Sequence, residues 1–303
     1  MLVINGVSHP GGAEIGLQRL VERLDGWEVE LIAPAVGGLQ RRRGARALLS
    51  MPGIARRARG HDVVYCNGTV AARTLPAVRG ARTVLHVHDL VDRVAPHWRR
   101  ADVVLADSEA VADRLAPLAS HVVGCPVELD VAPAAPPWET DGRPVVGYVG
   151  RIEPRKGVLD LVRAAPHIDA RVVLVGDDPY DSDPAYRELV RASRAVEHVG
   201  WVADAARLMS HLDVLVVPSH AEPFGTVAAE AIAAGTPVVA TTVGGLPEVV
   251  EDGVTGALVP PGRPDALVEG VARALALGPV PVQAAHRWSA DAYARRVESL
   301  IAP

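Results

Sequence analysis

Short apolar runs rich in valine alternate with helix-like patterns along almost the whole chain. The runs predict strands at 2–5, 28–33, 62–66, 83–88, 103–106 and 121–123, and again at 145–149, 171–175, 196–199, 214–217, 238–240 and 257–259. Helical periodicity fills the intervals at 13–24, 70–78, 108–115, 157–165, 185–195, 203–211, 226–234, 247–251 and 264–277. Alternation of this kind predicts the α/β class, with doubly wound parallel sheets covered by helices on both faces.

The organisation into domains follows from one proline-rich stretch. Residues 131–144 read VAPAAPPWETDGRP and form the best linker in the chain. We therefore expect a first Rossmann-like domain at 1–132, a linker at 133–142, a second Rossmann-like domain at 143–285 and a C-terminal segment at 286–303, with its helix at 291–301. Ligands of open α/β sheets bind beyond the carboxyl ends of the strands, so the two domains are expected to face a cleft.

The composition narrows the possible classes of protein. Hydrophobic residues make up 49% of the 303 positions and charged residues 22%, which excludes disorder as the dominant state. Two cysteines, Cys66 and Cys125, exclude a disulfide scaffold and are expected to be buried free thiols in a reducing compartment. The start, MLVINGVSHPGG, lacks the pattern of a signal peptide, and glycine and proline interrupt the longest nearly uncharged run, at 231–249. We expect a cytoplasmic protein.

The charge is distributed unevenly. Residues 35–100 hold thirteen arginines against three aspartates, a net +10, whereas residues 101–303 hold sixteen basic and twenty-eight acidic residues, a net −12. The basic part indicates an anionic partner or, alternatively, a solvated surface. Apolar residues lie among the arginines of Arg41–Arg59, so an interfacial helix on the inner face of the membrane is one interpretation, although Pro52 and Gly53 are expected to break it. Nucleic acid is not expected, because no aromatic residues interleave the arginines.

Two glycine-containing loops have the composition of phosphate-binding turns. Gly11 and Gly12 follow the first strand and open a helix, so their amides can approach an anion; a plain tight turn is the alternative. The loop RIEPRKG follows the first strand of the second domain and carries Arg151, Arg155 and Lys156. These cations suit a diphosphate whose charge grows as it leaves, and a solvated charge run is the alternative.

The segment EPFGTVAAE, residues 222–230, has the composition of a sugar-binding element. Gly225 opens a helix, so backbone donors near Phe224 and Thr226 are expected to point into the cleft. Glu222 and Glu230 lie eight residues apart and would contact different parts of one extended ligand, since carboxylates accept hydrogen bonds from sugar hydroxyls. The next glycine turn, Val243-Gly-Gly-Leu-Pro-Glu248, is interpreted as a second cleft loop or as ordinary strand-to-helix geometry.

His86 and His88 end the fourth strand and share one face of it. Such a pair can bind a metal ion, but the sequence offers no third ligand at a helpful spacing, so no metal is expected. His88 beside a ligand is the favoured interpretation, and a structural histidine is the alternative.

Four residues are rare in this chain. Lys156 is its only lysine among 31 basic residues, Phe224 its only phenylalanine, and Asn5 and Asn67 its only asparagines. All four map to loops or strand ends on the predicted cleft side, which independently supports the cleft as the functional site.

The chain resembles the family 4 retaining glycosyltransferases, which have the GT-B fold. The resemblance rests on GGAE at 11–14, HD at 88–89, GRIEPRKG at 150–157, HAEPFGTVAAEAIAAGTPVVATTVGGLPEVVEDGVTG at 220–256 and the final WSADAYARRVESL. It spans nearly the whole chain and is strongest over 145–275. It implies a C-terminal helix that packs back toward the first domain.

The resemblance also implies roles for the matching residues. Glu222, with the amides of Phe224 and Gly225 and with neighbouring Thr226, would hold the donor sugar, and Glu230 the ribose. Arg151 and Lys156 would neutralise the diphosphate. Gly12 would cap the diphosphate or admit the acceptor, and His88 would lie beside the reacting centre. No cofactor or metal is implied.

The sequence therefore predicts a retaining hexosyltransferase that uses a UDP- or GDP-sugar and makes an α-linkage to an acceptor hydroxyl of a small molecule, lipid or glycan. The alternatives are a GT-B nucleotide-sugar epimerase and a non-catalytic nucleotide-sugar binder. The first domain is short for the family, and Cys125-Pro-Val-Glu128 replaces its usual Asn-Gly-Val-Asp stretch.

Overall fold

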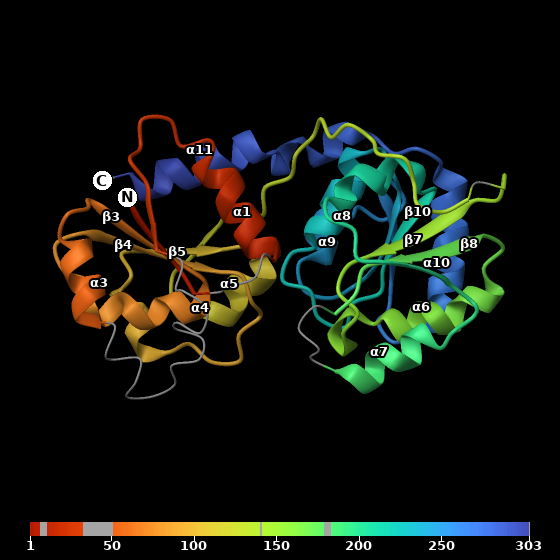
Figure 1. Ribbon diagram of the computed structural model, residues 1–303, viewed down its shortest axis with the longest axis horizontal. Coiled ribbons are helices and arrows are strands. Elements are labelled where there is room, and N and C mark those ends of the chain that lie inside the picture. Colours follow the sequence, from red (N-terminus) through yellow and green to blue (C-terminus); the bar gives the residue numbers. More distant parts are fainter. Residues whose placement is uncertain (7–10, 33–50, 140, 179–182, 303) are drawn as a thin grey trace. The chain divides into compact units, whose positions relative to one another are not determined.

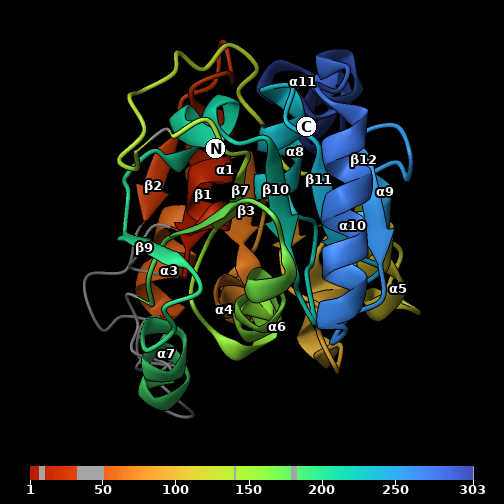
Figure 2. The same ribbon diagram turned by 90° about the vertical axis from the view of Figure 1, so that its right-hand side faces the viewer.

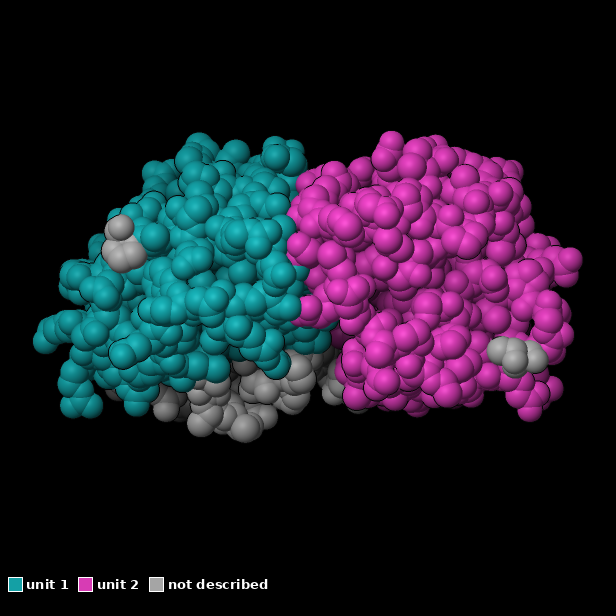
Figure 3. Space-filling model, turned by 90° about the horizontal axis from the view of Figure 1, so that it is seen from above, with its two compact units in different colours: residues 1–126, 290–303 teal, residues 127–289 magenta. Residues whose placement is uncertain are grey.

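The computed structural model describes residues 1–6, 11–32, 51–139, 141–178 and 183–302, which form two compact units. Unit 1 comprises Met1–Pro126 and Ala290–Pro303, and unit 2 comprises Val127–Ser289. Figure 3 colours the two units separately. Arg41, Arg42, Arg43 and Arg46, which belong to the basic segment singled out from the sequence, lie outside the described residues.

Unit 1 contains a six-stranded parallel sheet in the order β2-β1-β3-β4-β5-β6. Its strands are β1 (Leu2–Asn5), β2 (Glu30–Ile32), β3 (Val63–Asn67), β4 (Arg82–Val87), β5 (Val103–Ala106) and β6 (His121–Val122). Its helices are α1 (Gly12–Val21), α3 (Met51–Ala58), α4 (Gly68–Ala71), α5 (Glu109–Leu115) and α11 (Ala290–Ile301), with 3₁₀ helices η1 (Ala72–Ala77) and η2 (Pro96–Arg100).

Alternation along the strands divides the core of unit 1 between the two faces of the sheet. Leu2 and Ile4 pack in one cluster with residues of α3, α4 and α5, whereas Met1 and Val3 pack in the other with residues of α1 and α11. The first and last helices of the chain, red α1 and blue α11, lie side by side in Figure 1. Arg23, two residues after the end of α1, pairs with Asp291 of α11 at 2.7 Å. The expected return of the C-terminal helix to the first domain is confirmed.

Unit 2 contains the second six-stranded parallel sheet, in the order β12-β11-β10-β7-β8-β9. Its strands are β7 (Val145–Val149), β8 (Arg171–Val175), β9 (Glu197–Gly200), β10 (Val214–Val217), β11 (Val238–Thr241) and β12 (Gly256–Val259). Its α-helices are α6 (Val158–Ala164), α7 (Pro184–Arg191), α8 (Thr226–Ala233), α9 (Leu246–Val249) and α10 (Pro264–Leu277). Its 3₁₀ helices are η3 (Pro154–Lys156), η4 (Ala165–His167), η5 (Ala205–His211) and η6 (Val282–Trp288).

The strands of unit 2 other than the edge strand β9 are mostly buried, because helices cover both faces of the sheet. One face packs with α6 and α10, and Figure 2 shows α10 lying along β11 and β12. The other face packs with α8, which η6 contacts in turn. The predicted α/β class and the two doubly wound sheets are confirmed.

Three local expectations were wrong. The helix expected at 70–78 divides into α4 and η1, which contains Pro76, and the one at 203–211 is the 3₁₀ helix η5. Cys66 is buried, but Cys125 is only half-buried, because it lies in the loop after β6 and not in a strand. The break expected at Pro52 and Gly53 concerns a helix whose first part lies outside the described residues; the two residues themselves lie in the first turn of α3, where proline has no amide bond to lose.

Within the described residues, no helix is long and apolar enough to cross a lipid bilayer.

The turn between η3 and α6 depends on Gly157, whose φ is +66°. A Cβ atom there would lie 1.9 Å from the carbonyl oxygen of Pro218. Gly262 has a similar φ of +70° but open space around it. We expect Gly262→Ala to cost about 1 kcal/mol of backbone strain. We expect Gly157→Ala to cost at least about 2 kcal/mol more, because the clash is with backbone. Urea unfolding of both variants checks this, and equal losses would contradict it.

Candidate functional site

In unit 2 the lysine and the first glutamate of the predicted site form an ion pair. Lys156 Nζ, in the loop after β7, lies 2.6 Å from Glu222 Oε2, in the loop after β10. Ser219 Oγ donates to the same oxygen at 3.1 Å. The side chains of Lys156 and Glu222 are only 16% and 9% exposed. The two motifs were assigned from the sequence to different parts of a ligand, and the tertiary structure also joins them to each other.

The ion pair fixes the charge of Glu222. Burial alone would raise the pKa of this carboxyl group, but the ammonium of Lys156 holds it below its usual range. Glu222 is therefore an anion at neutral pH. Within the described residues both contacts use Oε2, which leaves Oε1 to accept hydrogen bonds from a ligand.

Glu153, which the sequence reasoning missed, joins the two arginines of the same loop. Its carboxylate lies 3.1 Å from Arg151 Nη1 and 2.7 Å from Arg155 Nε. The carbonyl of Arg155 accepts from the amide of His220 at 2.8 Å, which ties the loop after β7 to the loop after β10. The signal that could have identified Glu153 is its place in the sequence, as an acidic residue between two arginines of one loop.

The N-terminus of α8 completes the cluster in unit 2. Gly225 caps the helix, and Phe224 is buried with its ring edge-on to Trp288 at 5.0 Å between centroids. Thr226 begins the helix and Glu230 lies about one turn further along it, both half-buried. Phe224 therefore contributes packing through its side chain, and only its backbone is left for hydrogen bonding to a ligand.

The position of this cluster follows from the topology of the sheet. The chain builds β7, β8 and β9 in one direction and returns to build β10, β11 and β12 in the other. The switch point lies between β7 and β10, and the loops with Lys156 and Glu222 follow these two strands. Ligands of open α/β sheets bind at such points.

Unit 1 has a polar cluster at its own switch point, between β1 and β3. Asn5 and Asn67 end these strands opposite one another, and Asn67 Nδ2 donates to Asn5 Oδ1 at 3.3 Å. His88, just after β4, places Nε2 2.8 Å from Asn67 Oδ1. The two rare asparagines thus contact each other, and one contacts the predicted histidine.

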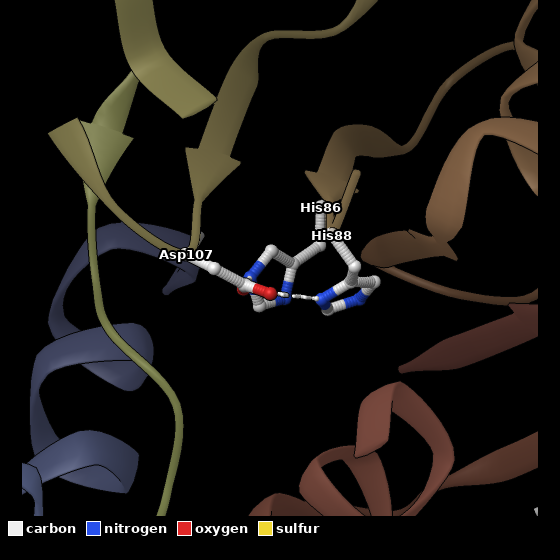
Figure 4. Close-up of side chains that lie close together, drawn as sticks. All are labelled: His86, His88 and Asp107. Carbon is white, nitrogen blue, oxygen red and sulfur yellow. Dashed lines mark hydrogen bonds and ion pairs between the residues drawn. The ribbon is translucent and has the colours of Figure 1, made fainter. Parts of the chain in front are cut away.

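Asp107, at the end of β5, joins His86 and His88 (Figure 4). Its Oδ1 lies 2.8 Å from His86 Nε2 and its Oδ2 3.0 Å from His88 Nδ1. The expectation that no third metal-ligating residue accompanies the histidines was wrong, because adjacent strands bring in Asp107, a residue type that also binds metals. The carboxylate of Asp107 thus lies between the two imidazoles, with His86 Nε2 near one oxygen and His88 Nδ1 near both.

The protonation states within this cluster differ. Burial lowers the pKa of His86 to about 4, and the neighbouring His88 lowers it as well. Burial would raise the pKa of Asp107, but His88 and His86 hold it far below its usual range. Burial would also lower the pKa of His88, but the Asp107 carboxylate raises it above the usual value. At neutral pH His86 is uncharged and Asp107 is an anion.

The Gly11-Gly12 turn is capped from within the protein. The amide of Gly11 donates to Glu14 Oε2 at 2.9 Å, and Gly12 is exposed with open space around it. An anionic ligand at this helix N-terminus would meet the carboxylate of Glu14. Of the nine predicted site residues, Gly12 and His88 lie in unit 1 and the other seven in unit 2.

Comparison with known proteins identifies the class of the second half of the chain. Residues 143–276, which lie in unit 2, match the sequence family described as Glycosyl transferases group 1. The two parallel sheets of the chain form the GT-B fold, as predicted.

Two relatives are similar to part of the chain. The uncharacterized glycosyltransferase MJ1607 of Methanocaldococcus jannaschii is 40% identical over 144 residues, 45% of this chain and 36% of that protein. A D-inositol 3-phosphate glycosyltransferase of Mycobacterium sp. (strain KMS) is 44% identical over 124 residues, 38% of this chain and 28% of that protein. The chain thus spans about a third of the length of these relatives.

A crystal structure of Anabaena Alr3699/HepE in complex with UDP and glucose matches nearly the whole chain. It covers 98% of both chains with a TM-score of 0.78 and 23% sequence identity. This similarity shows the shared fold.

The neutral, buried His86 makes the stability of the protein sensitive to acid. An unfolded histidine binds a proton below pH 6.5, whereas folded His86 does so only near pH 4. The neutral state of His86 therefore contributes about 3 kcal/mol to the free energy of unfolding. This contribution is complete above pH 6.5 and is lost as the pH falls toward 4. We expect the stability difference between the wild type and His86→Gln to shrink by about that amount between pH 7 and pH 4.5. Chemical unfolding at both pH values measures it, and a constant difference would disprove the neutral state.

Proposed function

We propose that the chain is a retaining glycosyltransferase that transfers a hexose from a nucleoside diphosphate sugar, a UDP- or GDP-sugar, to an acceptor hydroxyl with an α-linkage. The observation that carries this proposal is the Lys156–Glu222 pair at the β7/β10 switch point, beside the N-terminus of α8. Cations, a fixed carboxylate and backbone donors come together there, as a sugar linked to a diphosphate requires. The names of the relatives and the UDP and glucose bound to HepE support it.

The proposed roles follow the chemistry of each group. Arg151 and Lys156 neutralise the diphosphate, whose negative charge grows as the bond to the sugar breaks. Glu222 accepts from sugar hydroxyls through Oε1, and the backbone near Phe224, Gly225 and Thr226 donates to the donor. Glu230 binds the ribose.

In unit 1 we assign Gly12 to the diphosphate or the acceptor, and His88 to the donor sugar. The acceptor oxygen bonds to the anomeric carbon on the face that the diphosphate leaves, and the acceptor proton passes to the leaving phosphate oxygen. No residue of this chain needs to act as a covalent nucleophile. In the proposed reaction, side-chain cations and helix N-termini stabilise the negative charge of the leaving diphosphate.

Removing Lys156 tests the site. In Lys156→Met the diphosphate loses a charge-assisted hydrogen bond worth about 1.5–3 kcal/mol, so kcat/KM is expected to fall about 10- to 150-fold. The variant also leaves Glu222 buried without its cation, which lowers stability. The double variant Lys156→Met/Glu222→Gln removes both charges and is expected to regain stability without regaining activity.

Arg263→Ala is the matched control. It breaks an exposed ion pair with Asp265 at the start of α10, so turnover and stability should stay near wild type.

The readouts for all variants are donor-dependent product formation and the rise in Tm with UDP, GDP, ADP or TDP, since ligand at 100 times its Kd adds about 2.7 kcal/mol to the free energy of unfolding. Unchanged turnover in Lys156→Met would disprove the assigned role.

Incubation of the donor without acceptor separates the other candidates. An epimerase changes the sugar of the donor, a transferase at most hydrolyses it slowly, and a binder leaves it intact. Conversion of the donor to an epimer would identify an epimerase. A rise in Tm with nucleotide, with no product from any acceptor tested, would identify a non-catalytic binder.

We also propose peripheral binding of the protein to anionic lipid through Arg41–Arg59, with a lipid-linked acceptor. Of the described part of this segment, Arg56, Arg57 and Arg59 are exposed, whereas Ile54 is buried in the core of unit 1. The attraction would therefore be electrostatic, without insertion of an apolar helix face. We expect sedimentation with phosphatidylglycerol vesicles at low salt, and loss of binding at about 0.5 M salt, because screening shortens the range of the charges. Failure to sediment at low salt would end this idea.

A further inference from the structure

Both ring nitrogens of His88 face hydrogen-bond acceptors. Nδ1 lies 3.1 and 3.0 Å from the two carboxylate oxygens of Asp107, and Nε2 lies 2.8 Å from Asn67 Oδ1. The amide nitrogen of Asn67 is used by Asn5, which turns the amide oxygen toward His88. An imidazole between two acceptors needs a proton on each nitrogen to satisfy both.

The neighbouring His86 has the opposite surroundings. The hydroxyl of Tyr65 lies 2.6 Å from His86 Nδ1 and is itself hydrogen-bonded to Tyr293 of α11. His86 Nε2 faces Asp107. A donor on one side and an acceptor on the other suit a neutral ring with one proton. His86 therefore donates to Asp107 without taking its charge, and this leaves the Asp107 anion to balance His88.

The remaining charged groups near His88 act in the same direction. Asp107 comes from the end of β5, Asp89 from the loop after β4 and Glu14 from α1, and the carboxylates of all three favour the charged form of His88. Burial is the opposing influence, and His86 adds no charge because it is neutral. The side chain of His88 is 12% exposed, so part of its ring reaches the surface at the strand ends.

We propose that Asp107 is a positioning residue that, together with Asn67, holds His88 as a doubly protonated hydrogen-bond donor. In this form His88 cannot accept a proton from the acceptor hydroxyl, so it is not a general base. Its role toward the substrate rests on the proposed transferase function: a substrate hydroxyl takes the place of Asn67 Oδ1 as the acceptor of the Nε2 proton. The protonation state itself rests only on the geometry of unit 1.

Nitrogen-15 NMR of the histidine rings tests the protonation state without any substrate. We expect both nitrogens of His88 to carry protons at pH 7.5 in the wild-type protein. In Asp107→Asn the titration midpoint should fall by about one pH unit or more, because the adjacent carboxylate is gone. Asn67→Asp places a carboxylate at Nε2 and should raise the midpoint. Shifts of opposite sign in the two variants indicate an effect of charge, because structural damage would move both midpoints in the same direction.

Asp89→Asn is the matched control, because it removes a nearby carboxylate that has no hydrogen bond to the His88 ring. It should move the midpoint less than Asp107→Asn does. A neutral His88 at pH 7.5 in the wild type, with the Asn67 amide donating to Nε2, would overturn the proposal. So would stoichiometric zinc retained by the wild type and lost from Asp107→Asn, since the three side chains would then be metal ligands.

The pH dependence of kcat/KM tests the role of His88 in transfer. A donor histidine is active below its pKa, so activity should fall at alkaline pH, and Asp107→Asn should move this fall to lower pH. A rate that rises with pH through the His88 midpoint found by NMR would show a base and overturn the donor role. If the protein transferred no sugar at all, the proposed function would fail, while the NMR arms would still decide the protonation state.

Discussion

Parallel pairing in both sheets confines polar chemistry to the ends of strands. Helices cover both faces of each sheet, so most residues within the strands are apolar, and an unpaired charged side chain there would have no solvent. Asn5 and Asn67 lie at the last residues of β1 and β3, and His88 and Asp107 follow β4 and β5 directly. In unit 2, Lys156 and Glu222 lie in the loops after β7 and β10. Each cluster is thus placed by the topology of its own sheet.

Burial then requires the polar groups to satisfy one another. Glu222 is held by Lys156 and Ser219, and Glu153 by two arginines. In unit 1 a hydrogen-bonded chain runs from Tyr65 through His86, Asp107 and His88 to the asparagines. An unpaired charge in such surroundings costs several kcal/mol, so each carboxylate has a counter-charge or donors. The same pairing fixes which groups carry charge when a ligand arrives.

The C-terminal helix links the network of unit 1 to its hydrophobic core. Tyr293, Val297 and Ile301 of α11 are buried beside Leu20 of α1, and Tyr293 also contacts Tyr65. This part of the core therefore depends on residues separated by almost the entire chain. The helix α11 therefore stabilises unit 1 and also holds Tyr65, at one end of the hydrogen-bonded chain, in place.

The sequence alone determined the α/β class, the strands and the loops that carry Lys156 and Glu222, because these depend on local periodicity and on motifs that are continuous in the chain. Its errors in secondary structure were local, as at η1 and η5, where helical periodicity did not distinguish α from 3₁₀ geometry. Only the tertiary structure decided that Lys156 pairs with Glu222, that Asp107 joins the two histidines, and that Asn67 faces His88. These contacts join residues on different strands, and the order of strands in a sheet, which sets them, is a property of the whole fold rather than of any segment.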